Sequence, residues 1–256
     1  MADLDLSKPT MARRLAPLLL LALNARPGLA AELPGNITFG GSLAFTSDSI
    51  YRGVSESDGH EAIQLDLHAD RSGTFLGAWG STRDHNLDPY GDYDLEVYLG
   101  HRFDLSTTWS ATLAARSRYF VGGDQEGSID YQEIAGSLTY LDRWSFSLAA
   151  LPNAVHYWYE ERVGRSASWI ADTTGQWLLD GRGFFLTGGA GYFYAGRTGP
   201  GIAAGGGYVY GNAGVAFEHG RWRIDAGYFA TGGKARQLTP YPVPHDHIAG
   251  TLVWRF

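Results

Sequence analysis

The chain has 256 residues, which suffices for one large β-barrel or for one to two soluble domains. Its 35 glycines, together with 15 Tyr, 12 Phe and 8 Trp, favour a fold of many short strands joined by tight turns. The sequence contains no cysteine, which excludes a disulfide framework and a thiolate site, and a formal charge of −7 without a basic stripe argues against a general nucleic-acid binder.

Residues 1–30 are predicted to be a targeting segment and not part of the fold. Arg13 and Arg14 precede an apolar run at 15–23, and the small residues at 28–30 form a cleavage site, which together indicate a secretory signal peptide behind an upstream extension. The run is shorter than the ~20 apolar residues that a transmembrane helix needs. The alternative is a buried N-terminal helix. Without residues 1–30, which hold four basic and two acidic residues, the formal charge is −9.

From residue 31 onward, apolar and polar positions alternate in successive segments. A period of two is typical of β-strands with two unlike faces. The expected strands are 36–46, 62–70, 74–81, 93–101, 107–120, 130–140, 144–150, 166–179, 184–194, 207–218, 222–230 and 247–256. In the last of them, Ile248, Leu252 and Trp254 share the apolar face. The parity of 74–81 is ambiguous because that segment is rich in glycine.

The connections between these strands alternate between long and short. Turns such as 71–73 and 141–143 are short, whereas segments such as 47–61 and 151–165 are long. Five tryptophans lie beside the short turns on the apolar parity: Trp109, Trp144, Trp177, Trp222 and Trp254. Short periplasmic turns, long outer loops and aromatic girdles are typical of outer-membrane barrels.

The predicted fold class is therefore all-β. We expect a transmembrane antiparallel up-and-down β-barrel of about 12 strands over residues 31–256, with short periplasmic turns and long extracellular loops. The alternative is a soluble β-sandwich or a lipocalin-like barrel, which alternates in the same way but has no reason to sort its connections by length.

The most distinctive stretch is 42–59, SLAFTSDSIYRGVSESDG. It resembles the opening motif of the TorF-type porins, also described as the Gcw_chp conserved domain, in which Ser-Asp precedes Arg-Gly-x-Ser. Ser49 stands where that family usually has an aromatic residue. Residues 73–81, GTFLGAWGS, and 95–100, LEVYLG, are similar to the next two blocks. The resemblance covers 40–101 well, and after that only the spacing of the strands is similar. It implies an outer-membrane porin.

The loop motif consists of Asp48, Tyr51, Arg52 and Gly53. Asp48 and Arg52 lie at the outer end of the first strand, where they are expected to pair and pin the first loop near the barrel mouth. Gly53 permits a tight bend. Two interpretations remain: a gating or constriction element, or a structural staple of the loop.

Charged residues on the polar parity are the candidates for function. The predicted pore-lining residues are Asp66, His68, Asp94, Glu96, Arg116, Arg118, Glu133, Arg223, Asp225 and Arg255. Such charges tune ion selectivity in an open pore, or pair across a narrow lumen and plug it. Acids dominate the second to fourth strands and Arg116 with Arg118 adds a basic wall, so opposed walls would create a transverse field.

Other site chemistries have weaker support. No Gly-x-Ser-x-Gly elbow is present, so a lipid hydrolase would need a Ser/His pair assembled in three dimensions. The run 245–247, His-Asp-His, is a weak metal signal and is expected to be a solvated loop, so no metal site is predicted. The aromatic run Tyr157, Trp158 and Tyr159 suggests a non-conducting adhesive or structural surface barrel as an alternative.

The sequence thus predicts a non-enzymatic porin or channel for passive diffusion of small polar solutes or ions, with a slight preference for cations. We expect it in the outer membrane of a Gram-negative bacterium, with both termini periplasmic. The expected partners are outer-membrane lipid, lipopolysaccharide, small solutes, and the barrel-assembly machinery through the closing strand that ends at Phe256. No nucleic acid and no cofactor is implied.

Overall fold

The computed structural model describes residues 31–33, 36–83, 91–123, 129–156, 164–196, 206–238 and 245–256. The predicted signal peptide lies outside these residues. Within the described part of the chain, no helix is both long enough and apolar enough to cross a membrane.

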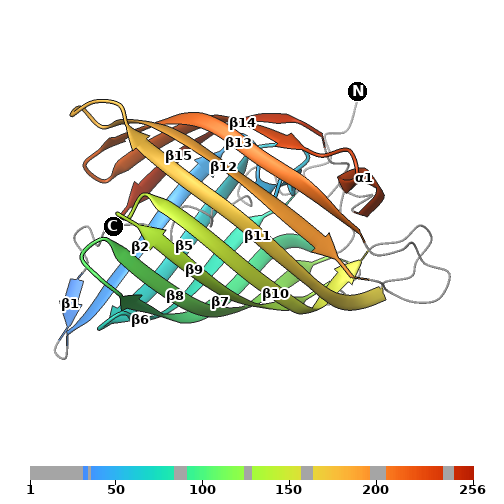
Figure 1. Cartoon of the computed structure of the whole chain (residues 1–256), viewed down its shortest axis with the longest axis horizontal. Helices are drawn as coiled ribbons and strands as arrows, with labels where there is room; N and C mark the ends of the chain where they lie inside the picture. The colour runs from blue at the N-terminus through green and yellow to red at the C-terminus, as the bar shows by residue number, and fades with distance from the viewer. Residues whose placement is uncertain are drawn as a thin grey trace, which may run out of the picture.

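Twelve antiparallel strands form one closed barrel, with the strands oblique to its axis (Figure 1). Each pairs with its neighbour in the sequence. The barrel strands are β2 (Ile37–Thr46), β5 (Ala62–Arg71), β6 (Thr74–Thr82), β7 (Gly91–Asp104), β8 (Trp109–Gly122), β9 (Tyr131–Tyr140), β10 (Trp144–His156), β11 (Gly164–Leu178), β12 (Phe184–Ala195), β13 (Gly206–His219), β14 (Trp222–Thr231) and β15 (His247–Arg255). The predicted fold of about twelve strands is confirmed.

The barrel closes where β15 pairs with β2, from Thr251 opposite Thr46 to Arg255 opposite Ser42. Beyond β15, the backbones of Phe256 and Gly41 exchange two hydrogen bonds of 3.0 Å. A short strand, β1 (Ala31–Leu33), pairs with the start of β2 past that point. Closure pairs the edges of β2 and β15, which an open sheet would leave unpaired.

The outer face of the barrel is apolar, because successive side chains of a strand point to opposite faces. Every barrel strand exposes apolar side chains on one parity, which is the predicted one except in β6, where none was assigned; examples are Leu43, Leu67, Leu99, Leu113, Ile134, Leu148, Leu186, Val215 and Ile248. The opposite parity carries buried polar and charged residues instead. This arrangement, apolar outside and polar inside, is typical of a barrel whose solvent is lipid.

Aromatic side chains gather at both ends of this apolar belt. Beside the short turns, the rings of Trp144 and Trp177 meet edge to face with centroids 4.2 Å apart, and Trp254 lies 4.9 Å from Phe256. Toward the other end, the ring of Trp169 stacks on that of Tyr194 at 5.4 Å. Tryptophan and tyrosine favour the two membrane–water interfaces.

The structure corrects one connection and adds four short elements. The segment predicted as a loop at 151–165 begins as strand, since β10 continues to His156 after a register shift between Leu151 and Ala154. The additions are β1, the two-residue strands β3 (Ile50–Tyr51) and β4 (Val54–Ser55), and the helix α1 (Ala235–Leu238). In Figure 1, α1 and the C-terminus lie toward opposite ends of the barrel.

The lipid-facing belt can be tested at Leu148 on β10, which is 67% exposed. Leu148→Arg is expected to lower the free energy of unfolding from lipid vesicles by about 2–4 kcal/mol, because it places a charge in hydrocarbon. Denaturant titration of the reconstituted protein measures this difference.

The matched control is Leu105→Arg, at an apolar residue in the turn after β7 that is 59% exposed. We expect little change there, since that turn contacts water. Equal losses in the two variants would contradict the position of the belt.

Candidate functional site

The first long connection folds into the barrel as an inner hairpin, residues 47–61. Its strands β3 and β4 pair through Ile50 with Ser55 and Tyr51 with Val54. Arg52 and Gly53 between them both have positive φ, 51° and 78°. Two such residues make a type I′ turn, whose twist suits a two-residue hairpin and which usually has glycine second. The bend predicted at Gly53 is therefore present.

The base of the inner hairpin is held by the carboxylate of Asp48, which is buried. Its Oδ2 lies 2.6 Å from Nδ1 of His247 at the start of β15. Its Oδ1 accepts hydrogen bonds from the hydroxyls of Ser55 at 2.5 Å and Ser57 at 3.1 Å. The predicted pair of Asp48 with Arg52 is wrong, because Asp48 bonds within its own loop and to β15, while Arg52 turns away to β9.

Arg52 crosses to the opposite side of the hairpin and is buried. Its Nη2 lies 2.5 Å from Oε2 of Glu133 on β9. Burial alone would lower the pKa of Arg52, yet the Glu133 carboxylate raises that pKa well above its ordinary value. Burial also raises the pKa of Tyr51, which keeps its hydroxyl protonated. The loop therefore carries a permanent cation into the lumen.

Arg118 on β8 binds the other side of the inner hairpin. Its Nη2 lies 2.5 Å from Oε2 of Glu56 in the hairpin, and its Nε donates to Oδ2 of Asp94 on β7 at 2.7 Å. The guanidinium also lies over the ring of Tyr51, 4.2 Å from its centroid, and donates to the hydroxyl of Tyr131 at 2.9 Å. This one side chain joins the hairpin to three barrel strands.

The tip of the inner hairpin touches the far wall. The hydroxyl of Thr231 on β14 donates to the carbonyl of Gly53, and Tyr208 on β13 donates to the carbonyl of Arg52 at 3.3 Å. A Cβ at Gly53 would lie 2.7 Å from the Cβ of Tyr210, so no side chain fits there. With its base on β15, its flanks on β8 and β9 and its tip on β13 and β14, the hairpin spans the lumen.

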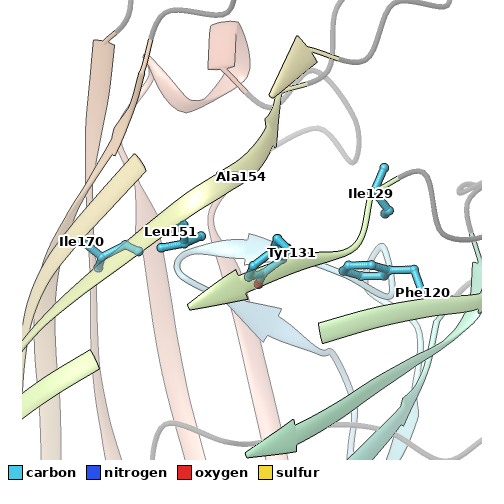
Figure 2. Close-up of a cluster of buried hydrophobic side chains, with 6 residues drawn as sticks. All are labelled: Phe120, Ile129, Tyr131, Leu151, Ala154 and Ile170. Atoms are coloured by element: carbon cyan, nitrogen blue, oxygen red, sulfur yellow. The ribbon is translucent and has the colours of Figure 1, made fainter. Parts of the chain in front are cut away.

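An apolar cluster fills the lumen wall beside the hairpin. It consists of Phe120, Ile129, Tyr131, Leu151, Ala154 and Ile170. In Figure 2, these side chains line one side of the barrel and the pale blue hairpin passes behind Tyr131. The cluster packs the lumen next to the Arg118 network, which removes those charges from water.

A cavity of about 140 Å³ remains beside the inner hairpin. Tyr51, Arg52 and Glu56 of the hairpin form part of its wall, together with Glu96 and Arg118. Much of the opposite wall comes from small residues on β11–β14, including Thr174, Gly189, Gly211, Asn212 and Gly227. Small side chains on that side leave the space that the hairpin does not fill.

The ten residues predicted to line a pore all lie on the inward parity. Glu96, Arg116, Arg118, Asp94 and Glu133 belong to the network around the hairpin. Asp66 and His68 form a separate pair, with Oδ1 to Nδ1 at 2.7 Å. Arg223, Asp225 and Arg255 form a third group with Glu218 near the short turns.

The predicted opposed acidic and basic walls are wrong. Arg118 pairs with Asp94 on the neighbouring strand, and Arg116 lies 3.6 Å from Glu96 and 3.4 Å from Glu133 on the strands to either side. The basic wall therefore stands between acidic strands. These charges are therefore compensated by neighbouring strands and do not face each other across the lumen as two opposed walls.

Sequence reasoning missed several interior residues. Trp79 on β6 is 5% exposed and lines the cavity, because its strand presents that parity inward, opposite Asp66 and Glu96. Glu56 was absent from the predicted set because it lies in a loop. Asp172 and Tyr210 also face inward. The parity of their strands could have identified them, because they alternate with aromatic residues that face outward.

Of the His245–Asp246–His247 run, the first two residues form the exposed loop that was expected, but the third does not. His247 is buried in β15, bonded to Asp48, and its Nε2 has no hydrogen-bond partner among the described residues. The nearby Ser55 and Ser57 donate their hydroxyls to Asp48 and not to the imidazole of His247. No group of three metal-ligating side chains occurs in the described ranges. Tyr157, Trp158 and Tyr159 lie outside them.

Comparison with known proteins identifies a family for most of the chain. Residues 30–192 match the model of a family described as "Bacterial protein of unknown function (Gcw_chp)". The match extends well past the 40–101 stretch on which the resemblance rested, and the predicted Gcw_chp relationship is confirmed. The TorF-type label stays a prediction. A search of curated proteins found no match.

Solved structures with a similar fold include two outer-membrane proteins. OccAB2 of Acinetobacter baumannii is 10% identical with a TM-score of 0.42, over 89% of this chain and 66% of its own. OccK1 (OpdK) of Pseudomonas aeruginosa is 13% identical with a TM-score of 0.40, over 88% and 66%. This chain spans just under two thirds of the length of each.

The ion pair at Arg52 is expected to stabilise the protein strongly. Arg52→Leu should lower the free energy of unfolding by about 3–5 kcal/mol, because it removes one partner of a buried pair and leaves Glu133 with less compensation. Denaturant titration in detergent micelles measures the loss.

The control is Arg102→Leu at the short-turn end, whose partners Asp104 and Asp142 are exposed. That change should cost less than about 1 kcal/mol, as exposed pairs do. A similarly small loss at Arg52 would show that the hairpin is not anchored through this pair.

Proposed function

Because this chain belongs to the Gcw_chp family of bacterial proteins, we propose that it is an outer-membrane channel through which small polar solutes or ions diffuse passively. The family description gives no activity, so the proposal rests on the barrel itself. One observation carries it: the barrel is apolar outside and charged inside, and it encloses a cavity between the inner hairpin and a wall of small residues.

The proposed location follows from the outer face. A continuous belt of exposed leucine, isoleucine, valine and aromatic side chains would aggregate in water, but is well solvated by lipid and lipopolysaccharide. The short turns are assigned to the periplasmic side, as in bacterial barrels generally, and the closing strand β15 to recognition by the assembly machinery. Secretion through a signal peptide belongs to the same proposal.

The inner hairpin is proposed as the constriction of this channel. It enters from the end opposite the short turns and contacts β8, β9, β13, β14 and β15. Solutes would pass along the small-residue wall of β11–β14, where the cavity lies. A polar or charged wall at this point selects among solutes by charge and size.

The second candidate function is a barrel that does not conduct. The buried pairs of Arg52 and Arg118 favour it, because they fix the hairpin across the lumen. In that case the interior charges form a structural network and the outer loops carry the function.

Single-channel recording in a planar bilayer separates the two functions. The proposal expects discrete conductance steps from the refolded protein. Replacement of residues 49–57 by a short Gly-Ser linker should enlarge those steps, because it removes the constriction. The same linker in place of the turn 105–108 serves as control and should leave the steps unchanged. A silent wild type that stays silent after the replacement would reject the channel.

The lumen should prefer cations. Five carboxylates and two guanidiniums line the cavity, so its wall is formally negative. Reversal potentials in a potassium chloride gradient should show cation preference, and Asn212→Lys on the cavity wall should shift it toward anions. Ser106→Lys, in an exposed turn, is the matched control. Anion preference in the wild type, or no shift from Asn212→Lys, would contradict the assigned path.

A further inference from the structure

The cavity beside the inner hairpin carries more negative than positive charge. Its carboxylates are Asp48, Glu56, Glu96, Asp172 and Asp225. Its guanidiniums are Arg52 and Arg118. Arg52 pairs with Glu133 outside the cavity wall, and Arg118 pairs with Asp94 outside it and with Glu56 within it. The positive charges are therefore already neutralised, and the surplus in the wall is acidic.

Two of these carboxylates are incompletely bonded by the described residues around them. Asp172 on β11 accepts hydrogen bonds from two neutral hydroxyls, those of Ser147 and Tyr210. Glu96 on β7 is 3% exposed, and its Oε1 has no hydrogen-bond partner among the described residues, with Arg116 3.6 Å away. By contrast, Asp225 makes two hydrogen bonds of 2.7 Å with Arg223. A buried carboxylate without a full set of partners costs free energy unless a hydrogen-bond donor or a cation arrives.

Aromatic side chains complete the same cavity. Trp79 from β6, Tyr210 from β13 and Phe229 from β14 all line it. An aromatic face attracts a cation through its quadrupole, most strongly in tryptophan, and the attraction grows when water is excluded. Carboxylates and aromatic faces around one small space are the two groups that recognise organic ammonium ions.

We propose that this cavity is a binding site for a small organic ammonium ion. The inference rests on the proposed channel for the route of entry, and it names the class of solute. A volume of about 140 Å³ suits a ligand of roughly the size of benzene. The ammonium would lie between Glu96 and Asp172, with its alkyl part against Trp79 and the glycine wall of β12 and β13.

Other solute classes fit this wall less well. An anion would meet the acidic surplus. A divalent metal ion would need three or more oxygen or nitrogen ligands in one cluster, which the described residues do not provide. A neutral polar solute gains nothing from the unneutralised carboxylates beyond a hydrogen bond. The organic cation alone satisfies both the carboxylates and the aromatic faces.

Titration calorimetry with choline tests the proposal on the full protein refolded in detergent micelles. The matched control ligand is the neutral alcohol in which carbon replaces the quaternary nitrogen of choline, so that shape is kept and charge removed. We expect choline to bind at least about tenfold more tightly than this alcohol, the ratio that corresponds to one favourable contact of the cation in a desolvated site. Equal affinities would overturn the proposal in favour of a merely apolar cavity.

Variants locate the site. Asp172→Asn and Glu96→Gln should each weaken choline binding by roughly tenfold. Trp79→Leu should weaken it by a few-fold, since it removes an aromatic face. Asp66→Asn is the matched control, because it removes an interior carboxylate that does not line the cavity, and it should leave choline binding unchanged. Far-UV circular dichroism confirms that each variant is folded.

The outcomes separate this proposal from that of the channel. Choline that binds to a barrel without conductance would keep the site and reject the channel. Conductance without choline binding would keep the channel and reject the site. Choline binding that Asp172→Asn and Glu96→Gln leave intact, or that Asp66→Asn weakens equally, would reject the assigned residues.

Discussion

The two-residue period of the strands, combined with closure of the barrel, is the constraint on which the rest of this structure depends. Closure leaves each side chain of a strand only two environments, the lipid-facing surface or the lumen. Leu148 and its equivalents occupy the first, and Glu133, Arg118 and Asp94 the second. Since β15 pairs with β2 in one register, a shift by one residue would exchange the two sets entirely.

Because of this constraint, the buried charges of the barrel wall determine where the inner hairpin lies. Arg116 and Arg118 must point into the lumen because Leu113 and Trp109 on the same strand point out. Buried guanidiniums need hydrogen-bonded partners, and the neighbouring strands supply only part of them. The hairpin supplies the remainder through Glu56, and in turn sends its own cation to a barrel carboxylate. The loop and the barrel wall thus each supply an ion-pair partner for a buried arginine of the other.

The barrel could be predicted from the sequence because its signals are local. Alternation, turn length and tryptophan position are each visible within about ten residues, and they gave the twelve strands and the inward parity of the ten charged residues. The end of β10 was missed for an equally local reason: Pro152 and Asn153 indicate a loop, but here they lie at a register shift within a strand.

The path of the first loop could not be predicted, because its partners are distant. Asp48 binds a residue almost two hundred positions away, and Arg52 one on β9. Within the motif, those two opposite charges four positions apart look like a local pair. Only the closed barrel brings β15 and β9 within reach of the same hairpin. Trp79 was ambiguous because Gly77 and Gly80 beside it carry no side chain to mark the parity.

The same arrangement of a tyrosine, a glycine and an aspartate on three neighbouring strands occurs twice in the lumen. Tyr98 on β7 lies over Gly77 on β6, where a Cβ would touch its ring, and donates to Asp66 on β5 at 2.6 Å. In the same way Tyr210 on β13 lies over a glycine of β12, Gly191, and donates to Asp172 on β11 at 3.2 Å.

The two arrangements differ in what surrounds the aspartate. Asp66 also binds His68 from its own strand, so its carboxylate is surrounded. Asp172 has only hydroxyl donors beside it, and the neighbouring interior positions on β12 and β14 include Gly189 and Gly227, which fill no space. The same tyrosine–glycine–aspartate geometry is therefore closed by packing at Asp66, whereas at Asp172 it forms part of an acidic cavity wall. The difference arises from the small residues around Asp172. They leave open the one part of the described lumen to which we assign a solute.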